Sequence, residues 1–338
     1  MAEFNFPPVR FGVIGVSGIG SEHLKQLEQL NIRGEAVVVA VADVQEQAAR
    51  AVSIQYQCDW YLDYKKMLSR RDIEAVMICA PSGLHGDITI NAARAGKHVI
   101  VEKPMEISIQ KAEEMVQVCE EEGVMLSVIY QNRFADDVMY LNEALRHGRF
   151  GQNVLINGAV YWYRSQQYYD GSAWRGTWAM DGGGAVMNQG IHTLDLILHL
   201  FGDYKSIRGY TACLGHERIE VEDLATSVLE FQSGALGVFS TTTCAYPGFD
   251  VRIEIIGSEG TAILEDNKLT LDVCRDRDMN SPLKESVPKQ SYRGLDLHGR
   301  QHHNVIQAIR GFEQLKVDGK EGLKALYAID ELYQGRLS

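Results

Sequence analysis

The stretch that decides the fold is RFGVIGVSGIG, residues 10–20. A short apolar strand runs into closely spaced glycines, and a helical pattern begins near Ser21. A tight glycine turn between a strand and a helix points backbone N–H groups and the positive end of the helix at a pyrophosphate. The stretch therefore predicts a dinucleotide-binding loop, formed by Gly15, Ser17, Gly18, Ile19 and Gly20.

The loop departs from the usual dinucleotide pattern at its middle position. Gly15 and Gly20 stand for the first and third glycines, but Ser17 occupies the middle place and Gly18 is displaced by one residue. We expect phosphate to bind through Gly18 or through the Ser17 hydroxyl. Because a glycine pattern alone is weak evidence, the assignment depends on the strands that follow.

A second apolar strand, residues 36–42, ends in Asp43. An acidic side chain at this place holds the adenosine ribose hydroxyls in dinucleotide folds, although a surface aspartate that merely closes a strand is the alternative. Asp43 would repel the extra phosphate of NADP, and neither Val44 nor Gln45 supplies a cation for it. The predicted cofactor is therefore NAD, with NADP less favoured.

Strands and helices keep alternating up to about residue 130. This alternation predicts a doubly wound parallel α/β sheet, the Rossmann fold, over residues 1–130. The further strands are expected at 75–80, 98–101 and 124–130, with helices near 84–95 and 107–122. Ligands bind such sheets at the carboxyl ends of the strands. The residues expected at those ends, and therefore near the cofactor, are Pro81, His85, Glu102 and Lys103.

Residues 131–318 follow a different pattern, in which a helix near 137–147 is followed by successive strand-like stretches. These stretches are 154–164, 206–214, 224–231, 235–244, 250–256, 261–265 and 268–273. They predict an α+β substrate domain with a large, mostly antiparallel open sheet. The uncovered face of this sheet is expected to form an interface with another copy of the chain, so we expect a homodimer or homotetramer through this sheet. Residues 319–338 are expected to form a helix that packs back on the N-terminal domain.

The motif DGGGAVMNQGIHTLD, residues 181–195, carries the polar groups best suited to chemistry. If a helix begins near Asn188, His192 lies four residues on and faces the same way, so one small molecule could touch both side chains. The alternative is that the glycines form a loop, Asn188 caps the helix and His192 lies in the core.

Composition excludes several classes of protein. The chain of 338 residues is 45% hydrophobic and 23% charged, which is typical of a globular protein with two domains. Its net charge of -12 argues against a nucleic-acid partner. The apolar runs are too short to span a membrane and the first residues lack a secretory pattern, so we expect a cytoplasmic protein.

Metal binding is not expected from the sequence. The six cysteines contain no CxxC pair. His298, His302 and His303 have no carboxylate or cysteine at metal-ligand spacing, so we interpret them as a polar helix start.

The glycine turn with Asp43, the segment AGKHVIVEKP at 95–104 and the motif at 182–195 together resemble the Gfo/Idh/MocA oxidoreductase family. The resemblance covers nearly the whole chain. It implies an NAD(P)-dependent dehydrogenase that acts on a secondary alcohol or carbonyl of a sugar, sugar derivative or cyclitol, in the manner of an inositol dehydrogenase. Two alternatives stay open: a catalytically silent cofactor-binding sensor, and a redox-assisted glycosidase of the same family.

The resemblance also assigns the reacting groups. The family's lysine and histidine correspond to Lys103 and His192. We expect His192 to act as the base and Lys103 to hold the same substrate oxygen, although the sequence does not decide which of the two accepts the proton. Asn188 replaces the aspartate that usually stands four residues before the histidine. It can hydrogen-bond a substrate hydroxyl but cannot hold a negative charge.

Three more residues are assigned by resemblance or position. Trp174 and Arg175 resemble a pair that contacts the cofactor in some members of the family. Arg133 lies where the chain is expected to cross between the domains, and a substrate role and a structural role are both open for it.

Overall fold

The computed structural model describes residues 6–275, 292 and 294–335. They belong to two compact units, one comprising Met1–Gln131 and Gln290–Leu323 and the other comprising Asn132–Lys289 and Lys324–Ser338. These units differ from the expected domain bounds on the C-terminal side. The described residues 294–318 group with the first unit, whereas the sequence pattern placed them in the substrate domain.

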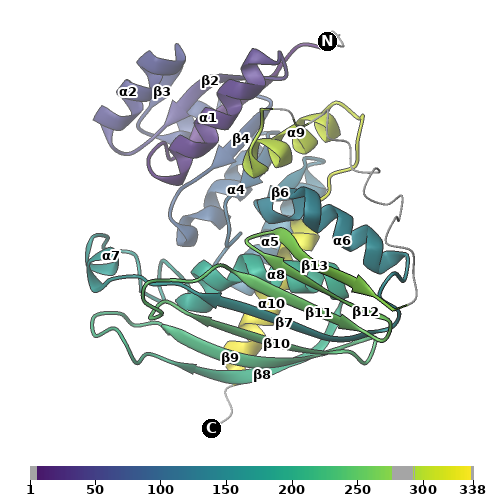
Figure 1. The fold of residues 1–338 in the computed structure, drawn as a ribbon. Coiled ribbons are helices and arrows are strands. Elements are labelled where there is room, and N and C mark those ends of the chain that lie inside the picture. The colour runs from purple at the N-terminus through teal and green to yellow at the C-terminus, as the bar shows by residue number, and fades with distance from the viewer. Residues whose placement is uncertain (1–5, 276–291, 293, 336–338) are drawn as a thin grey trace. The chain divides into compact units, whose positions relative to one another are not determined.

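The first unit contains a six-stranded sheet in the order β3-β2-β1-β4-β5-β6 (Figure 1). Its strands are β1 (Val9–Ile14), β2 (Ala36–Ala42), β3 (Asp59–Tyr61), β4 (Ala75–Ile78), β5 (His98–Val101) and β6 (Leu126–Val128). Every neighbouring pair in this sheet is parallel. The doubly wound α/β fold expected from the sequence is therefore confirmed, and β3 is the strand that the sequence pattern missed.

The first unit also contains helices. They are α1 (Ile19–Ile32), α2 (Glu46–Tyr56), α3 (Tyr64–Leu68), α4 (His85–Arg94), α5 (Ile109–Glu121) and, from the later part of the chain, α9 (Leu297–Ile309). Helix α9 packs against α1. Helix α9 begins at Leu297, so the helix start expected at His298 is present, but His302 and His303 are buried rather than exposed polar residues, His302 completely.

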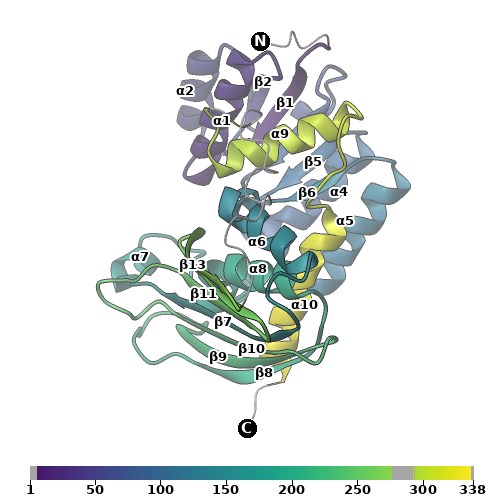
Figure 2. The same ribbon diagram turned by 45° about the vertical axis from the view of Figure 1, so that its right-hand side comes forward.

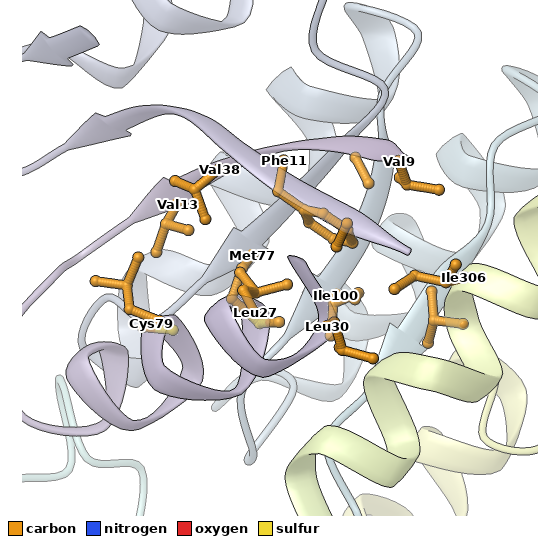
Figure 3. Packing of buried hydrophobic residues seen from close by; sticks show 14 of the residues in the cluster. Val9, Phe11, Val13, Leu27, Leu30, Val38, Met77, Cys79, Ile100 and Ile306 are labelled. Atoms are coloured by element: carbon orange, nitrogen blue, oxygen red, sulfur yellow. The ribbon is translucent and has the colours of Figure 1, made fainter. Parts of the chain in front are cut away.

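The core of the first unit forms where β1 and its neighbours meet α1 and α9 (Figure 3). Alternate residues of β1 point into it, and α1 contributes an apolar stripe at helical spacing. The buried side chains include Val9, Phe11, Val13, Leu27, Leu30, Val38, Met77, Ile100 and Ile306. This packing fixes α1 directly after β1, and therefore fixes the glycine turn that joins them.

The second unit contains a seven-stranded sheet in the order β13-β12-β11-β7-β10-β9-β8 (Figure 2). Its strands are β7 (Asn153–Tyr161), β8 (Tyr204–Ala212), β9 (Leu224–Phe231), β10 (Leu236–Thr242), β11 (Arg252–Gly257), β12 (Gly260–Glu265) and β13 (Lys268–Cys274). All neighbours are antiparallel except β7 and β10, which are parallel. The mostly antiparallel sheet is thus confirmed.

The helices of the second unit are α6 (Asp136–Arg146), α7 (Gln166–Asp170), the π-helical turn η3 (Ala185–Gly190) and α8 (Ile191–Phe201). Helix α10 (Gly319–Gln334) begins in the first unit and continues in the second from Lys324. Helix α8 packs closely against β7 at Gly158, where an added Cβ would lie 2.5 Å from Ile197 Cδ1. Among the described residues, no helix is long and apolar enough to cross a membrane.

Candidate active site

The glycine turn after β1 is closed on one side and open on the other. A Cβ at Gly20 would lie 2.1 Å from the carbonyl oxygen of Gly15, and a Cβ at Gly15 would lie 2.7 Å from that of Cys79. Gly18 has a φ of 55° and would meet no atom within 4 Å. Ser17, Gly18 and Ile19 are exposed, and α1 starts without a side-chain cap. The turn therefore fits a pyrophosphate at the helix N-terminus.

Asp43 follows β2 and holds the glycine turn in place. Its Oδ2 accepts a hydrogen bond from the backbone N–H of Val16 at 3.0 Å, and its Oδ1 accepts one from the N–H of Gln45 at 2.8 Å. A carboxylate oxygen can accept more than one hydrogen bond, so both oxygens remain suited to ribose hydroxyls. Asp43 thus ties the glycine turn to the end of β2.

Pro81 and His85 lie in the turn that follows β4. Pro81 precedes the short helix η1 (Ser82–Leu84). The ring nitrogens of His85 lie 2.7 Å from the carbonyl oxygen of Ala80 and 2.8 Å from that of Pro104. Burial lowers the pKa of His85, which is 1% exposed. The ring therefore ties the turn after β4 to the turn after β5.

Glu102 fixes the backbone of Lys103 from within the first unit. Its Oε2 accepts a hydrogen bond from the Lys103 N–H at 2.9 Å, and its Oε1 lies 2.8 Å from His23 Nε2. The other ring nitrogen of His23, Nδ1, lies 3.0 Å from Nε2 of His302. Burial alone would raise the pKa of Glu102, but the hydrogen bond and the charge of His23 lower it to about 2. His23 was not singled out from the sequence, and His302 was not expected beside it, because the two residues come from distant segments.

The motif at 181–195 contains a helix that begins earlier than expected. The helical path starts at Ala185 as a π-turn and becomes α-helical at Ile191, so Asn188 lies inside it. From Asp181 to Leu198, Asn188 and His192 are the two residues that are not buried. This segment therefore presents an amide and an imidazole on its accessible side.

The glycines of this motif serve packing against the protein itself. A Cβ at Gly184 would lie 1.8 Å from the carbonyl oxygen of Glu222, and a Cβ at Gly183 would lie 2.2 Å from Tyr333 Oη. The Glu222 carboxylate accepts hydrogen bonds from the N–H groups of Gly184 and Val186 and from the Tyr333 hydroxyl. Burial raises the pKa of Glu222. Sequence reasoning missed Glu222 and Tyr333 as the groups that shape this segment.

A buried aspartate orients Asn188. The Asn188 Nδ2 donates to Asp181 Oδ1 at 2.9 Å, and Asp181 Oδ2 accepts from the N–H of Gly176 at 2.9 Å. Asp181 is 2% exposed. Because the amide nitrogen of Asn188 is held in this way, its orientation is set by the protein.

Arg133 and Asp195 form a buried ion pair. Arg133 Nη2 lies 2.6 Å from Asp195 Oδ1, and Nε donates to Oδ2 at 2.9 Å. Both residues are almost completely buried. This geometry favours the structural role for Arg133, because the pair anchors α8 three residues after His192.

Trp174 and Arg175 belong to an arginine–aromatic cluster, made of Trp162, Arg164, Tyr168, Trp174 and Arg175. The Arg175 guanidinium lies 4.6 Å from the Tyr168 ring, and the Arg164 guanidinium lies 5.3 Å from it. Within the described residues, the buried Nε groups of both arginines lack a hydrogen-bond partner. The cluster therefore offers two cations to an anionic ligand.

The expected residues divide between the two units. The glycine turn, Asp43, Pro81, His85, Glu102 and Lys103 lie in the first unit, whereas Arg133, Trp174, Arg175, Asn188 and His192 lie in the second. A Rossmann unit with a glycine turn and a ribose-type carboxylate, together with a unit that presents an accessible histidine, defines a nicotinamide-dependent oxidoreductase.

Comparison with protein families identifies the particular class. Residues 9–130 match the model of the oxidoreductase family with an NAD-binding Rossmann fold, and residues 138–263 match the GFO/IDH/MocA C-terminal domain. The chain belongs to the Gfo/Idh/MocA family. It is an oxidoreductase that acts on CH–OH groups with a nicotinamide cofactor, and NAD is the cofactor that its Rossmann domain fits.

Individual relatives are similar along almost their whole length. The chain is 27% identical to the myo-inositol 2-dehydrogenase of Thermotoga maritima, over 94% of this chain and 93% of the relative. It is 32% identical to the WlbA dehydrogenase of Bordetella pertussis, solved with NADH and UDP-GlcNAcA, with a TM-score of 0.89 over 97% of this chain and 95% of that one. A levoglucosan dehydrogenase solved with NADH and levoglucosan shares the fold at 19% identity, with a TM-score of 0.87 over 97% of each chain. These matches support a dehydrogenase rather than a silent sensor or a glycosidase.

Proposed function

We propose that this chain oxidises a secondary hydroxyl group of a sugar, sugar derivative or cyclitol with NAD, using His192 as the base. The observation that carries the proposal is the accessibility of Asn188 and His192 on a segment whose other residues from Asp181 to Leu198 are buried. An imidazole kept accessible in an otherwise buried helix start is suited to exchanging a proton with a bound ligand.

The chemistry follows from what hydride loss requires. When a C–H bond breaks as hydride, the proton of the same alcohol must leave, so a base must lie within hydrogen-bond reach of that oxygen. His192 takes this proton in the proposal. Asn188, whose nitrogen is held by Asp181, orients a neighbouring hydroxyl. NAD, when bound, supplies the hydride acceptor.

Lys103 is proposed to hold the reacting oxygen and stabilise the negative charge that develops on it. The support is the family resemblance together with the fixed backbone of Lys103, whose N–H donates to the buried Glu102. A lysine placed by a rigid strand end is a better electrostatic partner than one in a mobile loop. The remaining cofactor contacts are proposed to come from Gly15, Ser17, Gly18, Ile19, Gly20 and Asp43.

We favour an anionic, nucleotide-linked sugar such as UDP-GlcNAcA over an uncharged cyclitol. The WlbA relative solved with that molecule is 32% identical in sequence to this chain, whereas the inositol dehydrogenase is 27% identical. The arginine–aromatic cluster adds an independent reason, because Arg164 and Arg175 can pair with phosphate or carboxylate oxygens while the aromatic rings contact sugar or base faces.

A substrate panel tests this proposal. Purified protein would be incubated with NAD, and in parallel with NADP, and with UDP-GlcNAcA, myo-inositol, scyllo-inositol or D-xylose, and NADH formation followed by its absorbance. We expect NADH formation with the nucleotide-linked sugar acid and a preference for NAD. Oxidation of inositol but not of UDP-GlcNAcA would overturn the substrate assignment and keep the dehydrogenase. If no sugar or cyclitol gave NADH, both the substrate assignment and the dehydrogenase activity would be overturned.

We also propose that the protein is cytoplasmic and forms a homodimer or homotetramer through its seven-stranded sheet. Apolar side chains of that sheet, including Val228, Leu236 and Val238, are exposed in the single chain. All six cysteines are free thiols, as in proteins of a reducing compartment. Light scattering over a dilution series checks the assembly, and a monomer at all concentrations would contradict it.

A further inference from the structure

Four side chains with metal-binding atoms converge at one end of the seven-stranded sheet: Cys213, His216, Asp223 and Cys244. Cys213 and His216 lie in the loop after β8, Asp223 directly precedes β9, and Cys244 follows β10. Strands β8, β9 and β10 are neighbours in the sheet, so their ends bring the three segments together. The sequence shows no metal-ligand spacing because the convergence arises only from strand pairing.

The ligand atoms of His216, Asp223 and Cys244 all lie within 4.8 Å of one another, which suits a single ion, and Cys213 lies beside them as the fourth ligand. His216 Nδ1 lies 3.0 Å from Asp223 Oδ2 and 3.8 Å from Cys244 Sγ. Cys213 Sγ lies 3.9 Å from Asp223 Oδ2. In a tetrahedral zinc site, with Zn–S of about 2.3 Å and Zn–N or Zn–O of about 2.0–2.2 Å, neighbouring ligand atoms lie about 3.3–3.7 Å apart. We propose that Cys213, His216, Asp223 and Cys244 bind one Zn²⁺ ion.

The histidine is already oriented as a ligand. Its Nε2 lies 2.9 Å from the carbonyl oxygen of Arg164, so Nε2–H donates there and Nδ1 is left to face the other three groups. Metal-binding histidines commonly donate their second ring N–H to a carbonyl or carboxylate in this way. The ring also packs edge-to-face against Tyr169 at 4.9 Å, and its side chain is 4% exposed.

The aspartate is fixed by backbone N–H groups. Its Oδ1 accepts from Leu214 at 2.9 Å, and its Oδ2 accepts from Gly215 at 2.7 Å and from His216 at 3.0 Å. On metal binding, the ion takes the place of the Nδ1 contact between His216 and Asp223, and the backbone hydrogen bonds persist. The carboxylate is therefore held in position before the ion arrives.

A buried His–Asp pair alone would need no metal, but two thiols also approach it. Cys213 and Cys244 are both exposed and come from different segments. The loop after β8 can approach Cys244 because residue 215 is glycine. A Cβ at Gly215 would lie 2.5 Å from the Sγ of Cys244. Thiolate ligands favour Zn²⁺ over Mg²⁺ or Ca²⁺. Four protein ligands make a closed site, so the ion would clamp the β8–β9 loop to the end of β10 and take no part in catalysis.

Zinc uptake has a defined proton balance. Two Zn–S bonds form and the two thiol protons leave to solvent. The proton between His216 Nδ1 and Asp223 Oδ2 leaves with them, so that the Nδ1 lone pair and a carboxylate oxygen bind the ion. No electron is transferred. Because protons are released, the affinity should rise as pH increases.

Cobalt substitution tests the site independently of any enzyme activity. The full chain would be reduced, stripped of metal with a chelator and titrated with Co²⁺, followed by Zn²⁺. We expect one equivalent of cobalt, with the d–d and thiolate charge-transfer bands of a tetrahedral thiolate site, and full displacement by zinc. Zinc should also raise the Tm of the chain.

Matched variants locate the ligands. Cys213→Ser, Cys244→Ser and His216→Ala should each lose or shift these bands, and the double variant Cys213→Ser/Cys244→Ser should lose both the charge-transfer band and the Tm increase. Cys58→Ser, outside the cluster, should behave as the wild type. The proposal is overturned if reduced protein binds no cobalt, if the charge-transfer band survives in the double variant, or if Cys58→Ser abolishes it. Reduced protein that forms a Cys213–Cys244 disulfide on reoxidation and never takes up cobalt would also overturn it.

Discussion

Asn188 donates a hydrogen bond from Nδ2 to Oδ1 of the buried Asp181 at 2.9 Å. The family resemblance implies an aspartate at this place, four residues before His192. In this chain such an aspartate would face the carboxylate of Asp181, and two carboxylates at this distance cannot both ionise without a large cost. The amide is therefore matched to its buried neighbour.

Asn188→Asp should destabilise the second unit by about 1–3 kcal/mol at neutral pH, since a hydrogen bond becomes a repulsion between like charges. The shared proton would raise the pKa of one carboxyl group in the folded state. Stability should consequently recover as pH falls below the raised value and decline as pH rises through it. Urea unfolding at pH 5 and pH 8 measures the effect. Asn188→Ala, which loses the hydrogen bond without adding charge, is the control, and equal stability of Asn188→Asp and wild type at pH 8 would refute the explanation.

His192→Ala and Lys103→Ala should each lower kcat by about 10²–10⁴-fold, because each removes a group that moves or stabilises charge on the reacting oxygen. The affinity for NADH, measured by fluorescence titration, should change little. His147→Ala and Lys65→Ala alter exposed residues of the same types and serve as controls. Near-normal turnover in both site variants would remove these residues from the mechanism.

Asp43→Asn should raise the KM for NAD by about 10–100-fold, the equivalent of one or two charge-assisted hydrogen bonds. It should also narrow the preference for NAD over NADP, since the charge that repels the extra phosphate is gone. Initial rates with both cofactors give this ratio. Asp43→Ala should raise the KM for NAD further, because the N–H groups of Val16 and Gln45 then lack their acceptor. An unchanged cofactor ratio in Asp43→Asn would show that this carboxylate does not select NAD.

The sequence predicted the strands well because each is an apolar or alternating run with clear turn residues at its ends. Residues 36–42 and 224–231 were predicted with the bounds that the structure gives to β2 and β9. Strand β3 was missed because Asp59–Tyr61 is short and half-exposed at the edge of its sheet.

The supports of the candidate site were harder to foresee. Glu222 and Tyr333 shape the glycine segment, and His23 contacts both Glu102 and His302. Each of these residues is separated from its partner by a long stretch of chain. Local patterns carry no information on such pairs, since only tertiary packing brings them together. The same reason hid the convergence of Cys213 and Cys244 on His216.

The Arg133–Asp195 pair should be costly to break. Asp195→Ala leaves the Arg133 guanidinium buried without its carboxylate, and we expect a loss of about 3–5 kcal/mol in the free energy of unfolding. Arg218→Ala removes one partner of an exposed pair with Asp170 and should cost at most about 1 kcal/mol. Urea denaturation of both variants makes the comparison. If the double variant Arg133→Met/Asp195→Leu is more stable than Asp195→Ala, the unpaired charge of Arg133 causes the loss of stability. Equal losses in Asp195→Ala and Arg218→Ala would contradict this explanation.

Glu102 should make the stability of the first unit depend on acid pH. Its pKa falls from the usual 4.5 to about 2 on folding, chiefly through His23 once the opposing effect of burial is included. A carboxyl group with a lowered folded-state pKa stabilises the fold above its unfolded pKa, and this contribution is lost as pH falls from about 4.5 towards 2. The full contribution corresponds to about 3 kcal/mol, of which about 2 kcal/mol should be gone at pH 3. Glu102→Gln cannot titrate, so the wild type should lose about 2 kcal/mol more than this variant between pH 6 and pH 3 in urea unfolding. Parallel losses in the two proteins would show that Glu102 is not held as a carboxylate by His23.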